Sequence, residues 1–150
     1  MQLALYQPDQ PQNTGTILRL GACLDVPVHI IEPCGFPFSI KALRRAAMDY
    51  IDHVEIIHHV DFEAFEAWRS DHKARLILLT TKASEPYTEA EFAPSDILLL
   101  GQESSGVPAN VHRLADLRLL IPMKRQMRSL NIAVSASMVL GEALRQTSRD

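Results

Sequence analysis

Three segments of this 150-residue chain place polar or charged side chains beside glycine or proline, in patterns that could serve chemistry. They are "NTGTILR" at residues 13–19, "GQESSGVP" at residues 101–108 and "KRQMRSLN" at residues 124–131. Arginine can bind an anion, a carboxylate or an amide can orient a hydroxyl, and glycine lets another group approach the backbone closely. Each segment is therefore a candidate part of a binding or catalytic site.

The first segment precedes and enters a helix that we expect over residues 14–24. Asn13 or Thr14 can cap this helix and offer its first backbone amides. Arg19 would then lie in the second turn, next to Leu20 on an apolar face. A single arginine on a helix is most often a solvated surface residue, so this segment alone does not identify a function.

The second segment predicts a tight loop at the end of a strand. Gly101 permits a close backbone approach, Gly106 permits a positive φ, and Pro108 suits the first turn of a helix. Glu103 either anchors backbone amides within this loop or accepts a hydrogen bond from a ligand hydroxyl or amine. The glycine spacing matches neither the dinucleotide fingerprint nor the Walker loop, so binding of those ligand classes is not expected.

The third segment leads into a helix that begins near Ile132 and has a broad face of small residues, where another backbone could pack. Ser129 can cap this helix, and Asn131 can hold a neighbouring loop. Capping does not explain the positive charge in the same loop, because the start of a helix favours negative charge. A bound anion would complete a site formed by the three basic residues, which are Lys124, Arg125 and Arg128.

The elements that must position these segments alternate along the chain, which predicts a single α/β domain with a parallel sheet flanked by helices. Apolar runs predict strands at residues 3–6, 28–31, 54–57, 76–79, 97–100 and 117–121. Helical patterns lie at residues 14–24, 39–48, 61–70, 109–115 and from 132 onward. Parallel sheets bind ligands beyond the carboxyl ends of their strands, and all three segments fall near such ends.

Composition limits the classes of function. The length of 150 residues, with 47% hydrophobic residues, fits one domain over 1–150, with a loose tail at about 147–150. A net charge of -3 means that nucleic-acid binding would need a local basic patch. Two cysteines, the absence of a signal-peptide pattern and the absence of a long apolar stretch predict a cytoplasmic protein outside the membrane. No zinc site is expected at His53, His58 and His59, which lack a partner at ligand spacing.

Taken in order, the three segments resemble the three motifs of the SPOUT RNA methyltransferases. The resemblance covers essentially the whole chain and is closest to the short, TrmL-type tRNA wobble-nucleotide (cytidine or uridine) 2′-O-methyltransferases. Those enzymes also carry segments like "HIIEPCGF", "LRRAAMDY" and "LTTK", which occur here. In one respect the sequence departs from them, because wobble enzymes often have a second asparagine shortly after the first, and "NIAVSAS" holds none at that place.

The resemblance implies a deep trefoil knot in the C-terminal part of the chain, with S-adenosylmethionine bound in it and S-adenosylhomocysteine as the product. It also implies a homodimer with the active site near the interface, tRNA as a partner, and no metal. The cofactor contacts by resemblance are Leu79, Gly101, Ile121 and Ser129. The catalytic set is Arg19 together with Asn13, Glu103, Ser129 and Asn131, and the RNA contacts are Lys41, Arg44, Arg45, Lys124, Arg125 and Arg128.

The chemistry implied is an in-line transfer of a methyl group from a sulfonium to a ribose hydroxyl. We expect Arg19 to hold a phosphate and stabilise developing oxyanion charge, because a guanidinium stays protonated and is a poor base. Arg19, Glu103 and Ser129 are expected to converge on one pocket. Two alternatives stay open, namely a 2′-O-methyltransferase acting on another tRNA or rRNA site and a noncatalytic RNA-binding module of the same fold.

Overall fold

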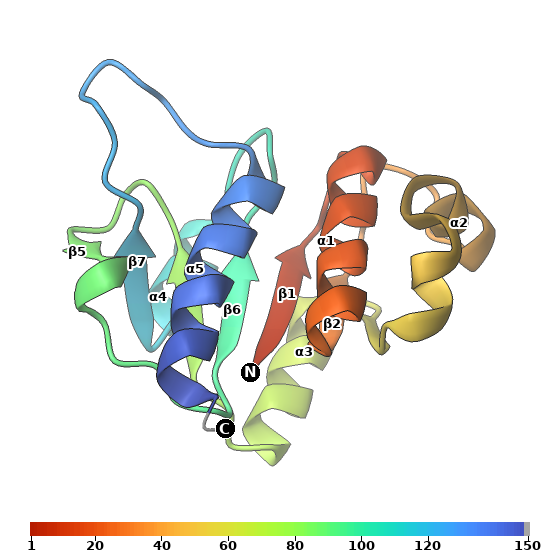
Figure 1. Ribbon diagram of the computed structural model, residues 1–150, viewed down its shortest axis with the longest axis horizontal. Helices are drawn as coiled ribbons and strands as arrows, with labels where there is room; N and C mark the ends of the chain where they lie inside the picture. Colours follow the sequence, from red (N-terminus) through yellow and green to blue (C-terminus); the bar gives the residue numbers. More distant parts are fainter. Residues whose placement is uncertain (149–150) are drawn as a thin grey trace.

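The strands of the protein, seen in a computed structural model that describes residues 1–148, form one sheet in the order β3-β2-β1-β6-β4-β7-β5 (Figure 1). All pairings between these strands are parallel. The strands are β1 (Gln2–Tyr6), β2 (Val28–Ile31), β3 (Ile56–His59), β4 (Leu76–Leu79), β5 (Glu85–Pro86), β6 (Ile97–Leu100) and β7 (Leu117–Leu120). The predicted α/β fold with a parallel sheet is confirmed.

The strands follow the apolar runs closely because most of them are covered on both faces. All four residues of β2 and all four of β6 are buried, and the predicted bounds of β2, β4 and β6 are confirmed. The prediction for β3 was wrong by two residues. This strand extends to His59, whose ring Nε2 lies 2.9 Å from Nδ1 of His29. A polar side chain of this edge strand is therefore buried.

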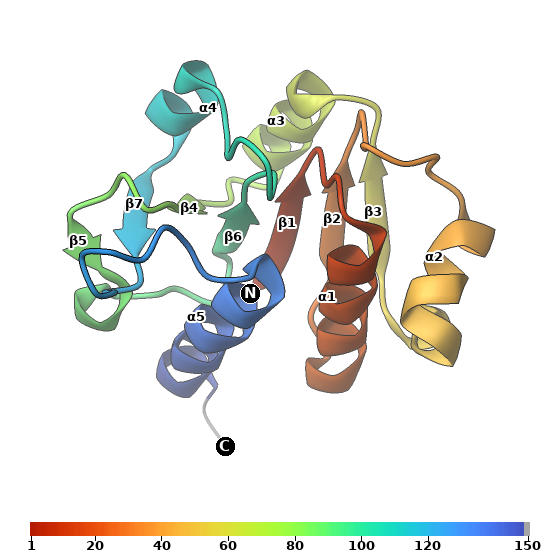
Figure 2. The same ribbon diagram turned by 90° about the horizontal axis from the view of Figure 1, so that it is seen from above.

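The helices divide between the two faces of the sheet, as Figure 2 shows. One face carries α1 (Pro11–Leu24), α2 (Ile40–Ala47), the 3-10 helix η1 (Met48–His53) and α5 (Ile132–Thr147). The other face carries α3 (Phe62–Asp71) and α4 (Ala109–Leu114), and a second 3-10 helix, η2 (Tyr87–Glu89), follows β5. Helices α2, α3 and α4 agree with the prediction to within one residue at each end. None of the helices within residues 1–148 combines the length and the apolarity needed to cross a bilayer.

Helix α1 begins earlier than its polar residues suggested. Pro11 occupies the first helical position and Gln10 precedes it without a side-chain cap, since proline has the backbone angle that a first turn needs. The prediction that Asn13 or Thr14 caps α1 was therefore wrong, and both lie in its first turn. Arg19, the ninth residue of the helix, lies in the third turn.

Helix α5 carries the chain further than the predicted loose tail allowed. Thr147 is its last residue, and the Thr147 hydroxyl donates a hydrogen bond to the carbonyl of Ala143 across 2.8 Å. Ser148 closes the helix through its backbone N–H. Arg149 and Asp150, the rest of the predicted tail, lie outside the described residues.

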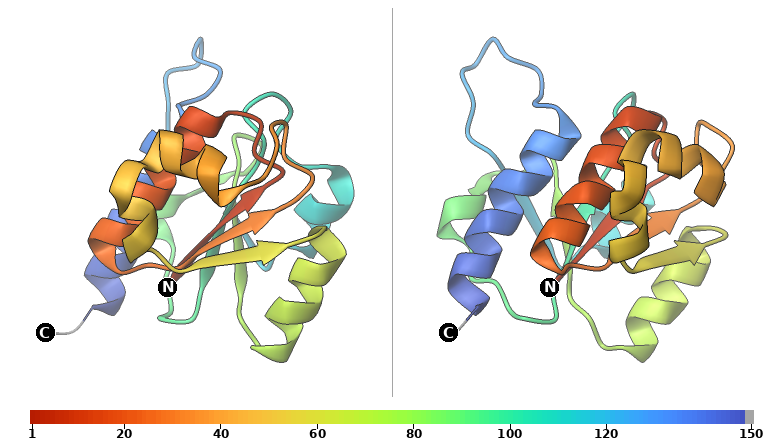
Figure 3. Two further views of the ribbon diagram at one scale, coloured as in Figure 1. Left: turned by 90° about the vertical axis from the view of Figure 1, so that its right-hand side faces the viewer. Right: turned by 45° about the vertical axis from the view of Figure 1, so that its right-hand side comes forward.

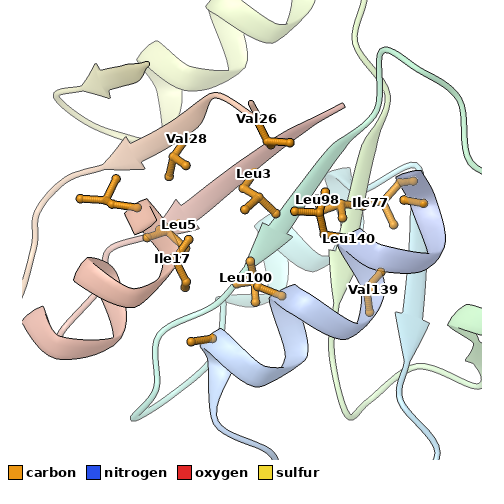
Figure 4. Close-up of a cluster of buried hydrophobic side chains, with 14 of the residues drawn as sticks. Leu3, Leu5, Ile17, Val26, Val28, Ile77, Leu98, Leu100, Val139 and Leu140 are labelled. Atoms are coloured by element: carbon orange, nitrogen blue, oxygen red, sulfur yellow. The ribbon is translucent and has the colours of Figure 1, made fainter. Parts of the chain in front are cut away.

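The larger of two apolar cores fixes the helices that carry the candidate site. Leu3 and Leu5 of β1 pack with Ile17 of α1, and Leu98 and Leu100 of β6 pack toward Leu140 of α5 (Figure 4). Truncating one such leucine to alanine costs about 2–5 kcal/mol. Because α1 and α5 pack on adjacent central strands, their amino ends are held near the carboxyl ends of β1 and β6.

Candidate active site

A cavity of about 570 Å³ opens at the carboxyl ends of β4, β6 and β7. The volume is in the range of small-molecule sites. All four expected cofactor residues line it: Leu79, Gly101 and Ile121 at three different strand ends, and Ser129 in the loop before α5. Further lining residues include Thr80, Thr81 and Lys82 of the "LTTK" segment, as well as Asn13, Glu103 and Asn131. The structure therefore brings these predicted residues together at one edge of the sheet.

One wall of the cavity is a loop that closes on itself after β6. Gln102 and Gly106 exchange two backbone hydrogen bonds of 2.9 Å each. A Cβ at Gly101 would lie 2.7 Å from the carbonyl carbon of Gly106, and Gly106 has φ of +66°. Both expectations about these glycines are confirmed. The loop has no room for a side chain at Gly101, so its backbone groups can lie directly against a ligand.

Glu103 anchors this loop to the start of α1. Its carboxylate accepts hydrogen bonds from the backbone N–H of Asp9 and from Nδ2 of Asn13, each at 3.3 Å. Glu103 therefore anchors a backbone amide, although this amide belongs to Asp9 before α1 and not to the loop of Glu103 itself. Burial raises the pKa of Glu103, and a second hydrogen bond, between the side-chain carboxyl groups of Glu103 and Asp9, raises it further. The same hydrogen bond is the main cause that lowers the pKa of Asp9, so Glu103 is the partner that holds a proton more tightly.

Asn131 joins the third segment to the first. Its Oδ1 accepts hydrogen bonds from the backbone N–H groups of Ala133 and Val134 at 2.8 and 3.3 Å. Its Nδ2 donates to Oδ1 of Asn13 across 2.9 Å. The prediction that Ser129 caps α5 was wrong, because Asn131 directly precedes the helix and takes that role. Asn131 was expected to hold a neighbouring loop, but its long-range partner is Asn13 in the first turn of helix α1.

Together these contacts form one hydrogen-bond network that links the three segments. Asn131 donates to Asn13, and Asn13 in turn donates to Glu103. Each side-chain amide of the network thus uses a donor and an acceptor at once. This hydrogen-bond network runs along one side of the cavity and fixes the distances between α1, α5 and the loop after β6.

Arg19 lies on the opposite side of this hydrogen-bond network from the cavity. It is exposed and lines an apolar groove of about 490 Å³ between α1 and α5, together with Thr16, Leu20, Cys23, Ala133, Val134 and Ser137. Asn13 and Asn131 line both the groove and the cavity. The prediction that Arg19, Glu103 and Ser129 share one pocket was therefore wrong in part. Glu103 and Ser129 do share it, and Arg19 flanks it across the two asparagines.

The basic residues fall into two separate groups within one chain. Lys124, Arg125 and Arg128 are exposed on the loop between β7 and α5, which projects from the body of the molecule (Figure 1). Lys41, Arg44 and Arg45 are exposed on α2, at the opposite end in Figures 1 and 2. Arg44 is engaged by Asp52, whose two carboxylate oxygens lie 2.8 and 2.7 Å from its guanidinium.

Two contacts near the site were missed by sequence reasoning. Asp9 meets Glu103 through a backbone hydrogen bond, and the ring of Tyr50 lies under Arg19. The only signal for Tyr50 was its place in the segment "LRRAAMDY", which carries no spacing rule of its own. Within the described part of the chain, no group of three or more His, Cys, Asp or Glu residues is arranged to hold a metal ion.

Known proteins resemble this chain over nearly its whole length. The sequence profile of the SpoU rRNA Methylase family matches residues 1–141. A protein of Beijerinckia indica subsp. indica named tRNA (cytidine(34)-2′-O)-methyltransferase is 62% identical over 144 residues, which cover 96% of this chain and 90% of that protein. A solved structure described as "Structural insights into the 2-OH methylation of C/U34 on tRNA" has a TM-score of 0.90 and 40% identity, with 97% of this chain and 94% of that chain covered.

A third similar protein was solved with a cofactor. It is an AdoMet-bound rRNA methyltransferase from Sinorhizobium meliloti, with a TM-score of 0.85 and 26% identity. The match covers 95% of this chain and 55% of that one.

Proposed function

The chain belongs to the SpoU rRNA Methylase family, and from this premise we propose that it methylates the 2′-hydroxyl of the ribose at the wobble nucleotide, position 34, of tRNA. The methyl donor is S-adenosylmethionine and the product is S-adenosylhomocysteine. The observation that carries the proposal is the hydrogen-bond network from Asn131 through Asn13 to Glu103. It places a ligand-sized cavity and an arginine-lined groove on either side of two shared asparagines.

The cavity is the site that we assign to S-adenosylmethionine. Its walls include the loop from Gly101 to Gly106, whose two glycines have no side chain to keep a ligand away from the backbone. Leu79 and Ile121, at the other two strand ends, and Ser129, in the loop before α5, would complete the contacts. Bound there, the cofactor supplies an electrophilic methyl group, and the residues of this chain hold and orient it.

The groove beside it is the entry that we assign to the nucleotide. Arg19 lines this groove, and a guanidinium is a donor at any cellular pH. We assign to Arg19 the binding of a substrate phosphate and the stabilisation of charge that develops on the ribose oxygen. The hydroxyl proton then passes to an acceptor other than Arg19, and a phosphate oxygen of the substrate is suited to this. Asn13, Glu103, Ser129 and Asn131 orient the reacting groups, which is a large part of the acceleration available to such a transfer.

A homodimer would complete the RNA-binding surface. Leu24, Val134 and Met138, on the exposed surfaces of α1 and α5, are 43%, 46% and 39% exposed, and burial of such side chains favours association. A second copy docked at α1 and α5 would cover part of the groove, which Val134 lines, so the nucleotide would be bound between the two copies. The basic loop of one copy and α2 of the other, with Lys41, Arg45 and partly neutralised Arg44, could then form one positive groove for an anticodon loop. Sedimentation of Val134→Glu should show a shift toward monomer.

The remaining parts of the proposal concern the chain as a whole. We infer a single domain whose C-terminal part forms a deep trefoil knot, and the return of the chain from β7, beside β4, to α5, which packs against α1 and β6, supports this. Mechanical extension from both ends should give a contour length shorter than that of an unknotted chain. The substrate proposed places the protein in the cytoplasm.

Methyl transfer can be tested with tRNA that lacks the modification. The protein is incubated with this tRNA and labelled S-adenosylmethionine, and the nucleosides are then identified by mass spectrometry. We expect labelled 2′-O-methylcytidine or 2′-O-methyluridine from the anticodon fragment. Label in another fragment or only in rRNA would favour action at a different site. Cofactor binding without transfer to any RNA would favour a noncatalytic RNA-binding module.

A further inference from the structure

The guanidinium of Arg19 lies over an aromatic ring. Its Cζ is 4.5 Å from the centroid of the Tyr50 ring, within the distance at which a cation is attracted to a ring face. Arg19 is exposed, whereas Tyr50 is half-buried in η1. The ring is therefore the more fixed of the two partners.

Close packing of α2 against α1 brings Tyr50 to this position. A Cβ at Gly15 would lie 2.5 to 2.7 Å from the Cβ, carbonyl carbon and carbonyl oxygen of Ala46, so the two helices meet at backbone distance. Figure 3 shows α2 lying along α1. Gly15 is one helical turn from Arg19, which places the close contact beside the residue that η1 must reach.

The turn between α2 and η1 is held in an unusual conformation. Met48 has φ of 58° and ψ of -143°, a region that residues other than glycine seldom occupy and that persists only where the surroundings enforce it. The surroundings here include the buried side chains of Ala47 and Ile51 on either side of Met48. A bidentate ion pair between Arg44 of α2 and Asp52 of η1 also spans the turn. The turn at Met48 before Tyr50 and the ion pair of Asp52 after it together fix the position of the Tyr50 ring.

We propose that Tyr50 is a positioning residue for Arg19, an inference that rests on the function proposed above. The guanidinium carbon of Arg19 lies over the ring, and the guanidinium N–H groups remain available to bind a phosphate. An exposed arginine otherwise samples many rotamers, and ordering it opposes substrate binding in the reactive geometry. Tyr50 holds Arg19 above the groove before the nucleotide arrives. Arg44, in turn, braces η1 through Asp52.

Steady-state kinetics of Tyr50 variants test this role. We expect Tyr50→Leu to lower kcat by about 5- to 30-fold, the range set by cation–π attraction at partly desolvated sites. KM for S-adenosylmethionine should stay unchanged, because Tyr50 does not line the cavity. Tyr50→Phe keeps the ring and should restore kcat to near the wild-type value. Tyr87→Leu, which removes a half-buried tyrosine from the other 3-10 helix, is the matched control and should leave kcat unchanged.

A spectroscopic readout separates this inference from the proposed function. The Nε–H resonance of Arg19, assigned by its absence in Arg19→Lys, should carry an upfield ring-current shift that Tyr50→Phe keeps and Tyr50→Leu loses. This measurement needs no activity, so it stands even if the wild type methylates nothing. If Tyr50→Leu does not fold, Tyr50→Met replaces it. Full activity of the ring-less variant, equal losses in Tyr50→Phe and Tyr50→Leu, or an Arg19 resonance that does not respond would overturn the proposal.

Discussion

Asn131 donates a hydrogen bond from Nδ2 to Oδ1 of Asn13 across 2.9 Å, and this contact joins residues 118 positions apart in the chain. Both asparagines line the cavity and the groove. Asn131 also caps α5, so the residue that starts the last helix sets its distance from the first. The cap of α5 and the hydrogen bond to Asn13 thus both depend on the side chain of Asn131. Substitutions of Asn131 can remove one of these contacts and keep the other.

Asn131→Ala removes the cap and the link together. Loss of the cap should lower the free energy of unfolding by about 1 kcal/mol, and loss of the link should also lower kcat/KM for methyl transfer by at least tenfold. Asn131→Ser is the matched variant, because serine is also a good cap but is too short to reach Asn13. We expect Asn131→Ser to recover the melting temperature and not the activity. Recovery of both would show that the link to Asn13 has no part in the reaction.

Arg19→Ala tests the division of the site into two parts. Because Arg19 lines the groove and not the cavity, the variant should bind S-adenosylmethionine with wild-type affinity in calorimetry. Methyl transfer should fall by about 10²- to 10³-fold, the usual effect of removing one donor to a developing oxyanion. Arg19→Lys should also be impaired, since an ammonium group lacks the flat, forked donor geometry. Full activity of Arg19→Ala would remove Arg19 from the mechanism.

Gly101→Ala tests the closed loop as a cofactor site. The added Cβ would lie 2.7 Å from the backbone of Gly106, so the loop must open and S-adenosylmethionine binding should weaken by at least tenfold. Gly141→Ala, on the exposed side of α5, meets nothing within 4 Å. That control should bind the cofactor normally and raise the free energy of unfolding by about 0.5–1 kcal/mol. Equal cofactor affinity in both variants would contradict the assignment of the loop.

Two buried histidines should make stability fall in acid. His29 and His59 lie with their ring nitrogens 2.9 Å apart, covered by Trp68 of α3. Burial, with smaller contributions from the charges of His59 and His72, lowers the pKa of His29 to about 3. Burial also lowers the pKa of His59. Both rings are therefore neutral in the folded protein, while in the unfolded chain they take up protons near pH 6.5.

The sign of the effect follows from this difference. The unfolded state binds more protons below pH 6.5, so stability is complete above that value and falls as the pH drops toward 3. The contribution of His29 to the slope should reach about 1.4 kcal/mol per pH unit, and His59 adds to it in the same direction. Urea unfolding at several pH values measures it. His29→Gln should flatten the slope, whereas His53→Gln, at an exposed site, should not, and an unchanged slope in His29→Gln would rule out His29 as a source.

Much of the fold could be predicted from the sequence because burial leaves a regular pattern. Strands β4 and β6 are uninterrupted apolar runs, and β2 is apolar apart from His29, so the bounds of all three follow from the pattern of apolar residues. The end of β3 could not be found in this way, since His59 becomes an inner residue only through its contact with His29. Strand β5, two residues of which one is proline, leaves no pattern to detect.

The parts of the site that depend on backbone conformation alone could be predicted from the sequence. The parts that depend on contacts between residues far apart in the sequence could not. Gly101 and Gly106 behave as their type requires. Ser129 and Asn131 are both good caps, and only the observed start of α5 selects Asn131. The position of Arg19 over Tyr50 depends on the contact between α1 and α2 and on the turn at Met48, 29 residues further along the chain. No spacing rule reports such a contact.

The acceptor position offers the most direct test of the central claim, which is transfer to the 2′-hydroxyl of nucleotide 34. Anticodon stem-loop RNAs are prepared with a single 2′-deoxynucleotide at position 33, 34 or 35, and methyl transfer from labelled S-adenosylmethionine is measured for each. We predict that only the RNA with deoxyribose at position 34 loses transfer completely. Continued labelling of that RNA, with loss at another position instead, would contradict the assignment.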